Sequence, residues 1–99
     1  MNISALEFSL PRATRASVTD DTLTVKLSDG RTLAVPLAWY PRLVHATAVE
    51  RANWRLIGAG AGINWPDIEE DLSVESLIAG RPSSESQSSL ARWLEARKK

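Results

Sequence analysis

The residues TLTVKLSDGRTLAVPL, at positions 22–37, decide the fold. Their two halves alternate apolar and polar side chains, which is the pattern of strands with one buried face. Asp29-Gly30 separates the halves, and this dipeptide between alternating runs predicts a tight hairpin turn. A shorter alternating run around Ala16 precedes a second turn at Asp20-Asp21. Residues 14–37 therefore predict a three-stranded antiparallel meander with one apolar face.

Beyond the meander, the pattern changes to short helical turns and then to a second strand region. Helices are expected at 41–46 and 48–52, and Thr47 begins the second of them in a capping-box arrangement. Apolar residues on both sides of the glycine-rich segment 58–62 predict a short strand pair. An acidic loop is expected to follow at 67–72.

Two further helices are expected in the last third of the chain. One ends at Gly80, and the other begins with Ser84 in capping-box spacing to Gln87. The predicted fold class is α+β: a three-stranded antiparallel meander plus a short strand pair, packed by short helices, with a C-terminal helix. We divide the chain into a domain at 1–82 and a Ser-rich linker with the C-terminal helix at 83–99.

The composition indicates an ordinary globular domain and argues against several kinds of site and partner. The 99 residues allow one domain, and 43% hydrophobic residues argue against disorder. Twelve basic residues balance twelve acidic ones, which argues against nucleic acid as the partner and is compatible with a homo-oligomer. The absence of cysteine excludes disulfides and thiolate metal sites. Neither a signal peptide nor a membrane-spanning run is visible, so we expect a cytoplasmic protein that does not enter membranes.

A long, discontinuous motif runs through the middle of the chain. Beside the Asp29-Gly30-Arg31 hairpin, its segments are Trp39-Tyr40-Pro41-Arg42-Leu43, Ala46-Thr47, Arg51-Ala52-Asn53-Trp54-Arg55-Leu56-Ile57-Gly58, Gly60, Gly62-Ile63, Trp65-Pro66-Asp67, Glu70-Asp71-Leu72-Ser73-Val74-Glu75, Leu77 and Ala79-Gly80. Over residues 14–82 the chain resembles the domain of unknown function 2442 family. The resemblance implies a small bacterial or phage-borne α+β domain without an assigned activity. Members often look like partners of another small protein, in arrangements resembling toxin–antitoxin pairs. Many relatives have a histidine where this chain has Asn64, which puts in doubt any proton-transfer or metal role for that position.

Acidic residues cluster in one short segment of the chain. Four carboxylates fall within five residues, at Asp67, Glu69, Glu70 and Asp71. They predict a solvated loop or a negative patch that docks a basic partner. A Mg²⁺ or Ca²⁺ site is the third option, but the spacing lacks the alternation and glycine of an EF-hand, so we expect no metal.

Aromatic and basic residues supply the other candidates for contact with partners. Trp39 and Trp93 each lie beside polar residues at the end of an expected element, which favours an interface. A basic tail is formed by Arg92, Arg97, Lys98 and Lys99. It predicts compensation of the helix dipole or, as an alternative function, contact with nucleic acid.

No catalytic arrangement is apparent in the sequence. His45 is the single histidine, so a Ser-His-Asp arrangement has no second anchor. The glycines at 58–62 precede a strand rather than a helix, unlike phosphate-binding loops. We therefore expect neither an enzyme nor a cofactor.

The leading hypothesis is a non-catalytic protein-interaction module, an antitoxin-like or regulatory partner of another small protein. The alternative hypothesis is a nucleic-acid-associated transcriptional regulator or adapter.

Overall fold

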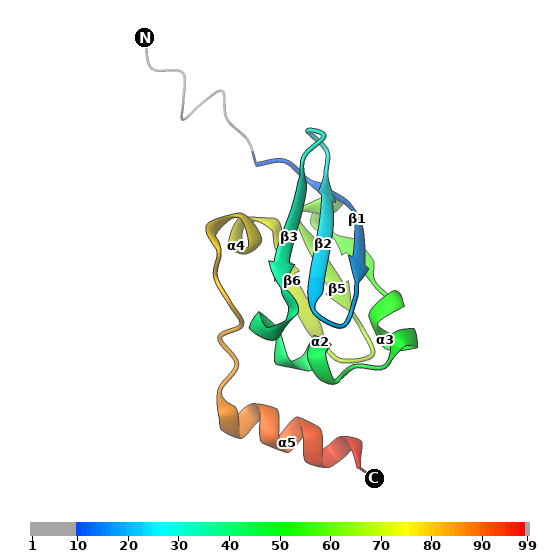
Figure 1. Ribbon diagram of the computed structural model, residues 1–99, viewed down its shortest axis with the longest axis vertical. Helices are drawn as coiled ribbons and strands as arrows, with labels where there is room; N and C mark the ends of the chain where they lie inside the picture. Colours follow the sequence, from blue (N-terminus) through cyan, green and yellow to red (C-terminus); the bar gives the residue numbers. More distant parts are fainter. Residues whose placement is uncertain (1–9, 99) are drawn as a thin grey trace.

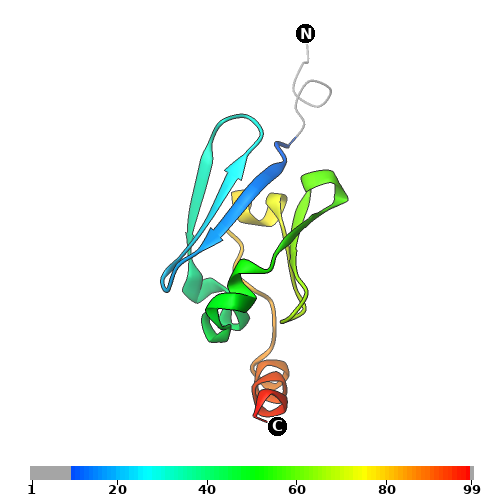
Figure 2. The same ribbon diagram turned by 90° about the vertical axis from the view of Figure 1, so that its right-hand side faces the viewer.

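The computed structural model describes residues 10–98, which form two antiparallel sheets that enclose the core between them (Figure 1; Figure 2). The first sheet has the order β1-β2-β3, with β1 (Ala13–Val18), β2 (Thr22–Leu27) and β3 (Thr32–Pro36). The second has the order β4-β5-β6, with β4 (Arg55–Ile57), β5 (Gly62–Trp65) and β6 (Glu70–Ser73). The predicted α+β class is confirmed.

Short helical segments connect the two sheets and cover their ends. They are η1 (Leu37–Trp39), α2 (Pro41–His45), α3 (Ala48–Ala52), η2 (Gly58–Gly60), α4 (Val74–Ala79) and α5 (Gln87–Arg97). The capping box predicted for α3 is present, because the Thr47 hydroxyl accepts from Glu50 N–H and the Glu50 carboxylate accepts from Thr47 N–H. Among residues 10–98, no helix combines the length and apolarity needed to cross a membrane.

The meander follows the alternation of the sequence. Leu23, Val25 and Leu27 on the central strand are at most 4% exposed and belong to the hydrophobic core. The turn after β2 places Gly30 at φ +94°, a conformation that glycine adopts without steric cost. Pro36 ends β3, an edge strand where its missing N–H costs no ladder bond.

The second sheet corrects the prediction of a strand pair followed by an acidic loop at 67–72. The second half of that segment forms the third strand, β6, which pairs with β5 from Trp65↔Glu70 to Gly62↔Ser73. Ile68 anchors the turn before β6, with 0% of its surface exposed, and Glu69 takes φ +54°. Burial of Ile68 and of Leu72, at 8% exposed, outweighs the low strand propensity of the acidic residues beside them.

The core lies between the sheets and centres on aromatic side chains. Trp65 and Tyr40 are its largest fully buried members, and the Trp65 indole N–H donates to the Arg51 carbonyl at 3.1 Å. That bond satisfies the polar end of the indole while its rings fill the core. Trp54 is half-buried against the same core.

The two sheets come together on one side and remain apart on the other. On the closed side, Gly60 packs so tightly that a Cβ there would lie 2.8 Å from the Ala13 carbonyl oxygen. On the open side the edge strands β3 and β6 are not paired with each other, and α4 lies across the gap (Figure 1). The cavity described below lies on this open side.

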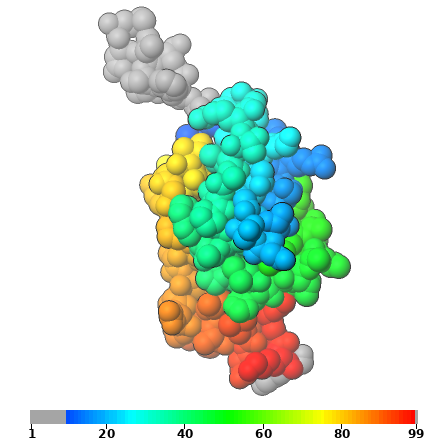
Figure 3. Space-filling view, in the orientation of Figure 1, coloured from blue at the N-terminus to red at the C-terminus, as the bar shows by residue number. Residues whose placement is uncertain are grey.

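The chain after α4 runs as an extended segment, residues 81–86, to α5, which lies against the helical end of the domain (Figure 3). We call residues 81–86 the strap. The expected capping box at Ser84 and Gln87 is not formed. Ser86 instead caps α5 by accepting from Ser89 N–H, while Glu85 is held by an ion pair described below.

Candidate functional site

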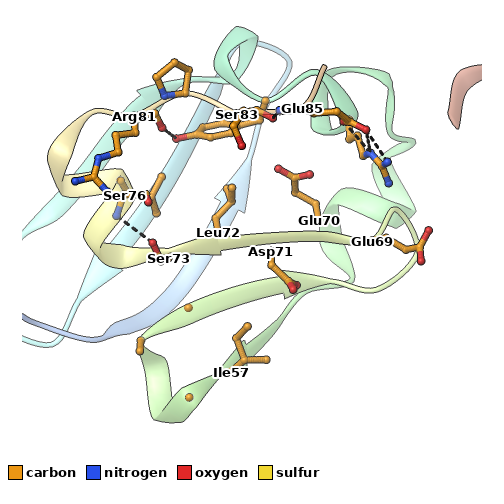
Figure 4. A pocket seen from close by; sticks show the side chains of 18 residues that line it. Ile57, Glu69, Glu70, Asp71, Leu72, Ser73, Ser76, Arg81, Ser83 and Glu85 are labelled. Atoms are coloured by element: carbon orange, nitrogen blue, oxygen red, sulfur yellow. Dashed lines mark hydrogen bonds and ion pairs between the residues drawn. The ribbon is translucent and has the colours of Figure 1, made fainter. Parts of the chain in front are cut away.

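A cavity of about 680 Å³ lies between β6 and the strap (Figure 4). The whole of β6 forms one wall, and strap residues 81–85 form the opposite wall. The remaining lining comes from Tyr40, Arg42, Ile57, Gly58, Ala61, Gly62, Glu69, Ser76 and Leu77. Because β6 pairs on one side only, its free edge borders this cavity.

The four carboxylates predicted as one acidic patch point in different directions. Asp67 accepts a hydrogen bond from the Asn53 side-chain amide at 2.9 Å. Asp71 points away from the strap and accepts from the Asn64 amide, and Glu69 lies at the outer end of the cavity (Figure 4). Glu70 alone extends from β6 toward the strap.

Glu70 is a half-buried carboxylate on the core-facing side of the sheet. Within residues 10–98 its side chain makes no hydrogen bond and no ion pair with the protein. Burial raises the pKa of Glu70 from 4.5 to about 7, and the neighbouring Arg42 guanidinium opposes part of that rise. The acid group therefore changes charge near neutral pH.

Arg42 is close to Glu70 but is fully engaged elsewhere. Its Nε and Nη2 bind the Glu85 carboxylate at 2.7–3.1 Å, and its Nη1 donates to the Ile68 carbonyl at 2.8 Å. The hydrogen bonds to Glu85 raise the pKa of Arg42, and the same contact lowers the pKa of Glu85. A two-pronged pair this well shielded fixes the strap to α2.

Tyr40 forms the floor of the cavity and ties it to the strap. Its side chain is 1% exposed, and its hydroxyl donates to the Arg81 carbonyl at 3.4 Å. Burial raises the pKa of Tyr40, with a smaller contribution from the Glu70 carboxylate, so the phenol stays neutral at physiological pH.

The comparisons with known proteins agree with this architecture. A family model described as "Protein of unknown function (DUF2442)" matches residues 13–83, most of the chain. The chain belongs to this family. A crystal structure of a protein of unknown function from Rhodospirillum rubrum is 27% identical, with a TM-score of 0.68, over 80% of this chain and 98% of that chain. No curated protein matches the chain significantly.

The match to the DUF2442 family contains both sheets and ends at Ser83, before α5 begins. In this family member, α5 docks through its polar and aromatic side chains, and none of its residues is fully buried. Two guanidinium groups lie over the Trp93 ring, with that of Arg42 4.9 Å and that of Arg97 4.6 Å from the ring centroid. These cation–π contacts cover much of the indole that we expected to be available to a partner.

Trp39, the other tryptophan expected at an interface, is also half-buried. It packs edge-on against Tyr40, with ring centroids 6.5 Å apart, and its carbonyl accepts from Ser83 N–H. Neither tryptophan lines the cavity next to β6. Of the predicted interface residues, the cavity therefore brings together only Glu69, Glu70 and Asp71.

The residues of the predicted basic tail also differ in their contacts. Arg97 binds the Glu50 carboxylate at 2.8 and 3.1 Å, and this contact lowers the pKa of Glu50 to about 2. Arg92 is exposed, and Lys98 lies 3.5 Å from Glu95 one turn earlier. Lys99 is outside the described residues. Arg97 thus holds α5 to α3, and the nucleic-acid alternative stays a prediction.

The side chains of residues 10–98 include no group of three or more histidine, aspartate or glutamate residues arranged to hold a metal ion. His45 is exposed, and its backbone carbonyl accepts from Arg97. The sequence reasoning did not identify Arg42, Tyr40 or Glu85 as site residues. Their contacts join positions about 40 residues apart, so no local spacing pattern signals them.

Proposed function

We propose that this domain is a non-catalytic protein-interaction module, an antitoxin-like or regulatory partner of another small protein. In this proposal the partner contributes an extended, basic segment that docks along the free edge of β6. The single observation that carries the proposal is that this edge borders a cavity and bears carboxylates without ion-pair partners.

The free edge of β6 offers backbone groups to an incoming strand. Extended peptides bind other proteins by adding a strand to such an edge, where main-chain hydrogen bonds give affinity and pockets give specificity. The strap stands opposite β6 across the cavity rather than pairing with it, which leaves room beside the strand. An uncovered edge strand is otherwise prone to aggregation, so occupation by a partner also protects it.

The charges around this edge favour a basic segment. The five ion pairs among residues 10–98 use the carboxylates of Asp20, Asp29, Glu50, Glu85 and Glu95. None of them uses the four carboxylates of residues 67–71. These four carboxylates therefore form no ion pair within the described chain, although Arg42 partly offsets the charge of Glu70. The negative charge that remains would attract and orient a positive partner.

The test is a pull-down of the tagged protein from its native host, with and without nuclease, read by mass spectrometry. The variant Glu69→Gln/Asp71→Asn removes two charges at the edge while preserving side-chain shape. The matched control, Glu75→Gln/Glu95→Gln, removes two exposed carboxylates elsewhere.

We expect one stoichiometric protein to survive nuclease and to bind the edge variant at least tenfold more weakly than the wild type, with the control unchanged. Equal recovery of that protein by both variants would contradict docking at β6. A set of partners that disappears with nuclease would favour the nucleic-acid alternative instead.

A further inference from the structure

The cavity between β6 and the strap contains a half-buried carboxylate, Glu70, that forms no ion pair with the described chain. Arg42 is engaged by Glu85 and by the Ile68 carbonyl, and Glu85 also accepts from the Ser89 hydroxyl. Glu70 faces the same space with no hydrogen bond or ion pair from the described chain. It differs from Glu69 and Asp71, which also line the cavity, because Glu70 alone of the three extends from β6 toward the strap (Figure 4).

We propose that the cavity receives the side chain of one arginine or lysine from the partner's docking segment, with Glu70 as its counter-ion. This inference rests on the proposed function and adds the chemistry of recognition to it. The partner's backbone lies along β6, and the basic side chain enters the cavity between β6 and the strap.

The lining of the cavity suits a long basic side chain along its whole length. The largely buried Leu72 and Leu77 line the cavity and give it an apolar wall for an alkyl stem. The charged head of that side chain would reach toward Glu70, which extends into the space facing the strap (Figure 4). Tyr40 closes the floor, so the head is partly shielded from water. A charge-assisted hydrogen bond in such a setting is stronger than the same bond at an exposed surface.

Pairing also relieves an unfavourable feature of the free domain. Burial disfavours the charged form of Glu70, and Glu85 and Asp71 add like-charge repulsion, while Arg42 provides partial compensation. A cation that binds the carboxylate favours its charged form and lowers its pKa. Binding is therefore expected to strengthen as the pH rises through the value of about 7 at which Glu70 titrates in the free domain.

The experiment uses the purified full-length protein and defined peptide probes. The first probe is the acetylated and amidated pentapeptide Thr-Val-Arg-Val-Thr, a strand former with one central arginine. In the second, neutral citrulline replaces arginine and preserves the shape. Binding is measured from amide ¹H–¹⁵N shifts of β6 and the strap at pH 5.5 and pH 8, for the wild type, Glu70→Gln and the control Glu75→Gln. Spermidine is the third probe and represents a free polyamine.

We expect the arginine peptide to shift the amides of β6 and the strap, and to bind at least tenfold more weakly to Glu70→Gln or when citrulline replaces arginine. We also expect wild-type affinity to rise severalfold from pH 5.5 to pH 8, and the pKa of Glu70, followed by carboxyl ¹³C shifts, to fall on binding. Equal binding of the arginine and citrulline peptides would overturn the inference, as would absence of binding at millimolar peptide. Binding of spermidine alone would overturn the assignment to a partner's side chain.

The two proposals fail in different ways. If Glu69→Gln/Asp71→Asn weakens capture of the partner while Glu70→Gln does not, the domain is an interaction module and the cation site is wrong. If the arginine peptide requires Glu70 but the captured protein responds to neither change, the cation site is present and the proposed docking of that protein at β6 is wrong.

Discussion

Replacement of Glu70 by glutamine is expected to stabilise the protein at alkaline pH and to have little effect under acidic conditions. The reason is that the pKa of Glu70 is higher in the folded state than in the unfolded state. Burial raises the pKa of this carboxyl from 4.5 to about 7, so the folded state binds a proton more tightly than the unfolded state. The contribution of Glu70 to stability is therefore greatest below pH 4.5 and is lost as the pH rises through 7.

The size of the effect follows from the two pKa values. The interval from 4.5 to about 7 corresponds to about 3 kcal/mol for a carboxyl that water does not reach. Glu70 is half-buried and opens into a cavity, so solvent screening reduces the cost to about 1–2 kcal/mol. Glutamine has nearly the same shape and carries no charge, so it removes this cost.

Urea unfolding followed by tryptophan fluorescence measures the effect. We expect the difference in the free energy of unfolding between Glu70→Gln and the wild type to grow from near zero at pH 4.5 to about 1–2 kcal/mol at pH 8. The control Glu75→Gln, at an exposed position, should show no such growth. A constant difference across this pH range, or a variant less stable than the wild type at pH 8, would refute the assignment of a destabilising buried charge.

Three other predictions concern the strap, α5 and the closed side of the sheets. Arg42→Ala removes a shielded two-pronged ion pair and should cost about 2 kcal/mol in urea unfolding, while Arg42→Lys should recover only part of that loss. Arg97→Ala should raise the pKa of Glu50 from about 2 toward 4.5 in ¹³C titrations and speed hydrogen exchange throughout α5. Gly60→Ala should cost about 2–4 kcal/mol in thermal unfolding, because φ is +94° and the new Cβ would meet the Ala13 carbonyl at 2.8 Å; an unchanged melting temperature would contradict the tight packing.

The meander and the short helices were predictable because their signals are local. Alternation around Val25, the turn at Asp29-Gly30 and the capping box at Thr47 each specify a conformation within a few residues. The strand at 70–73 was missed because acidic residues disfavour strands by propensity. Its pairing depends on the burial of Ile68. That burial is a tertiary effect, and the hydrophobic periodicity of the sequence does not predict it.

The candidate site was only partly predictable for the same reason. The acidic composition of residues 67–71 pointed to the correct region, but a sequence pattern does not show which of four neighbouring carboxylates turns inward. The register of β6 against β5 decides this, because it puts Glu70 and Leu72 on the core side and Asp71 on the outer side. The cavity itself arises from the strap, which Arg42 and Glu85 fix across 43 positions of sequence.

The way α5 is fastened has a consequence for how the chain is able to evolve. The helix rests on the domain through Arg42, Trp93 and Arg97, and contributes no fully buried side chain to the interior. An appendage held in this manner is gained, lost or exchanged by changing a few surface residues, with no repacking inside the sandwich. Changes of sequence beyond Ser83, where the match to the family ends, therefore leave the packing between the two sheets unchanged.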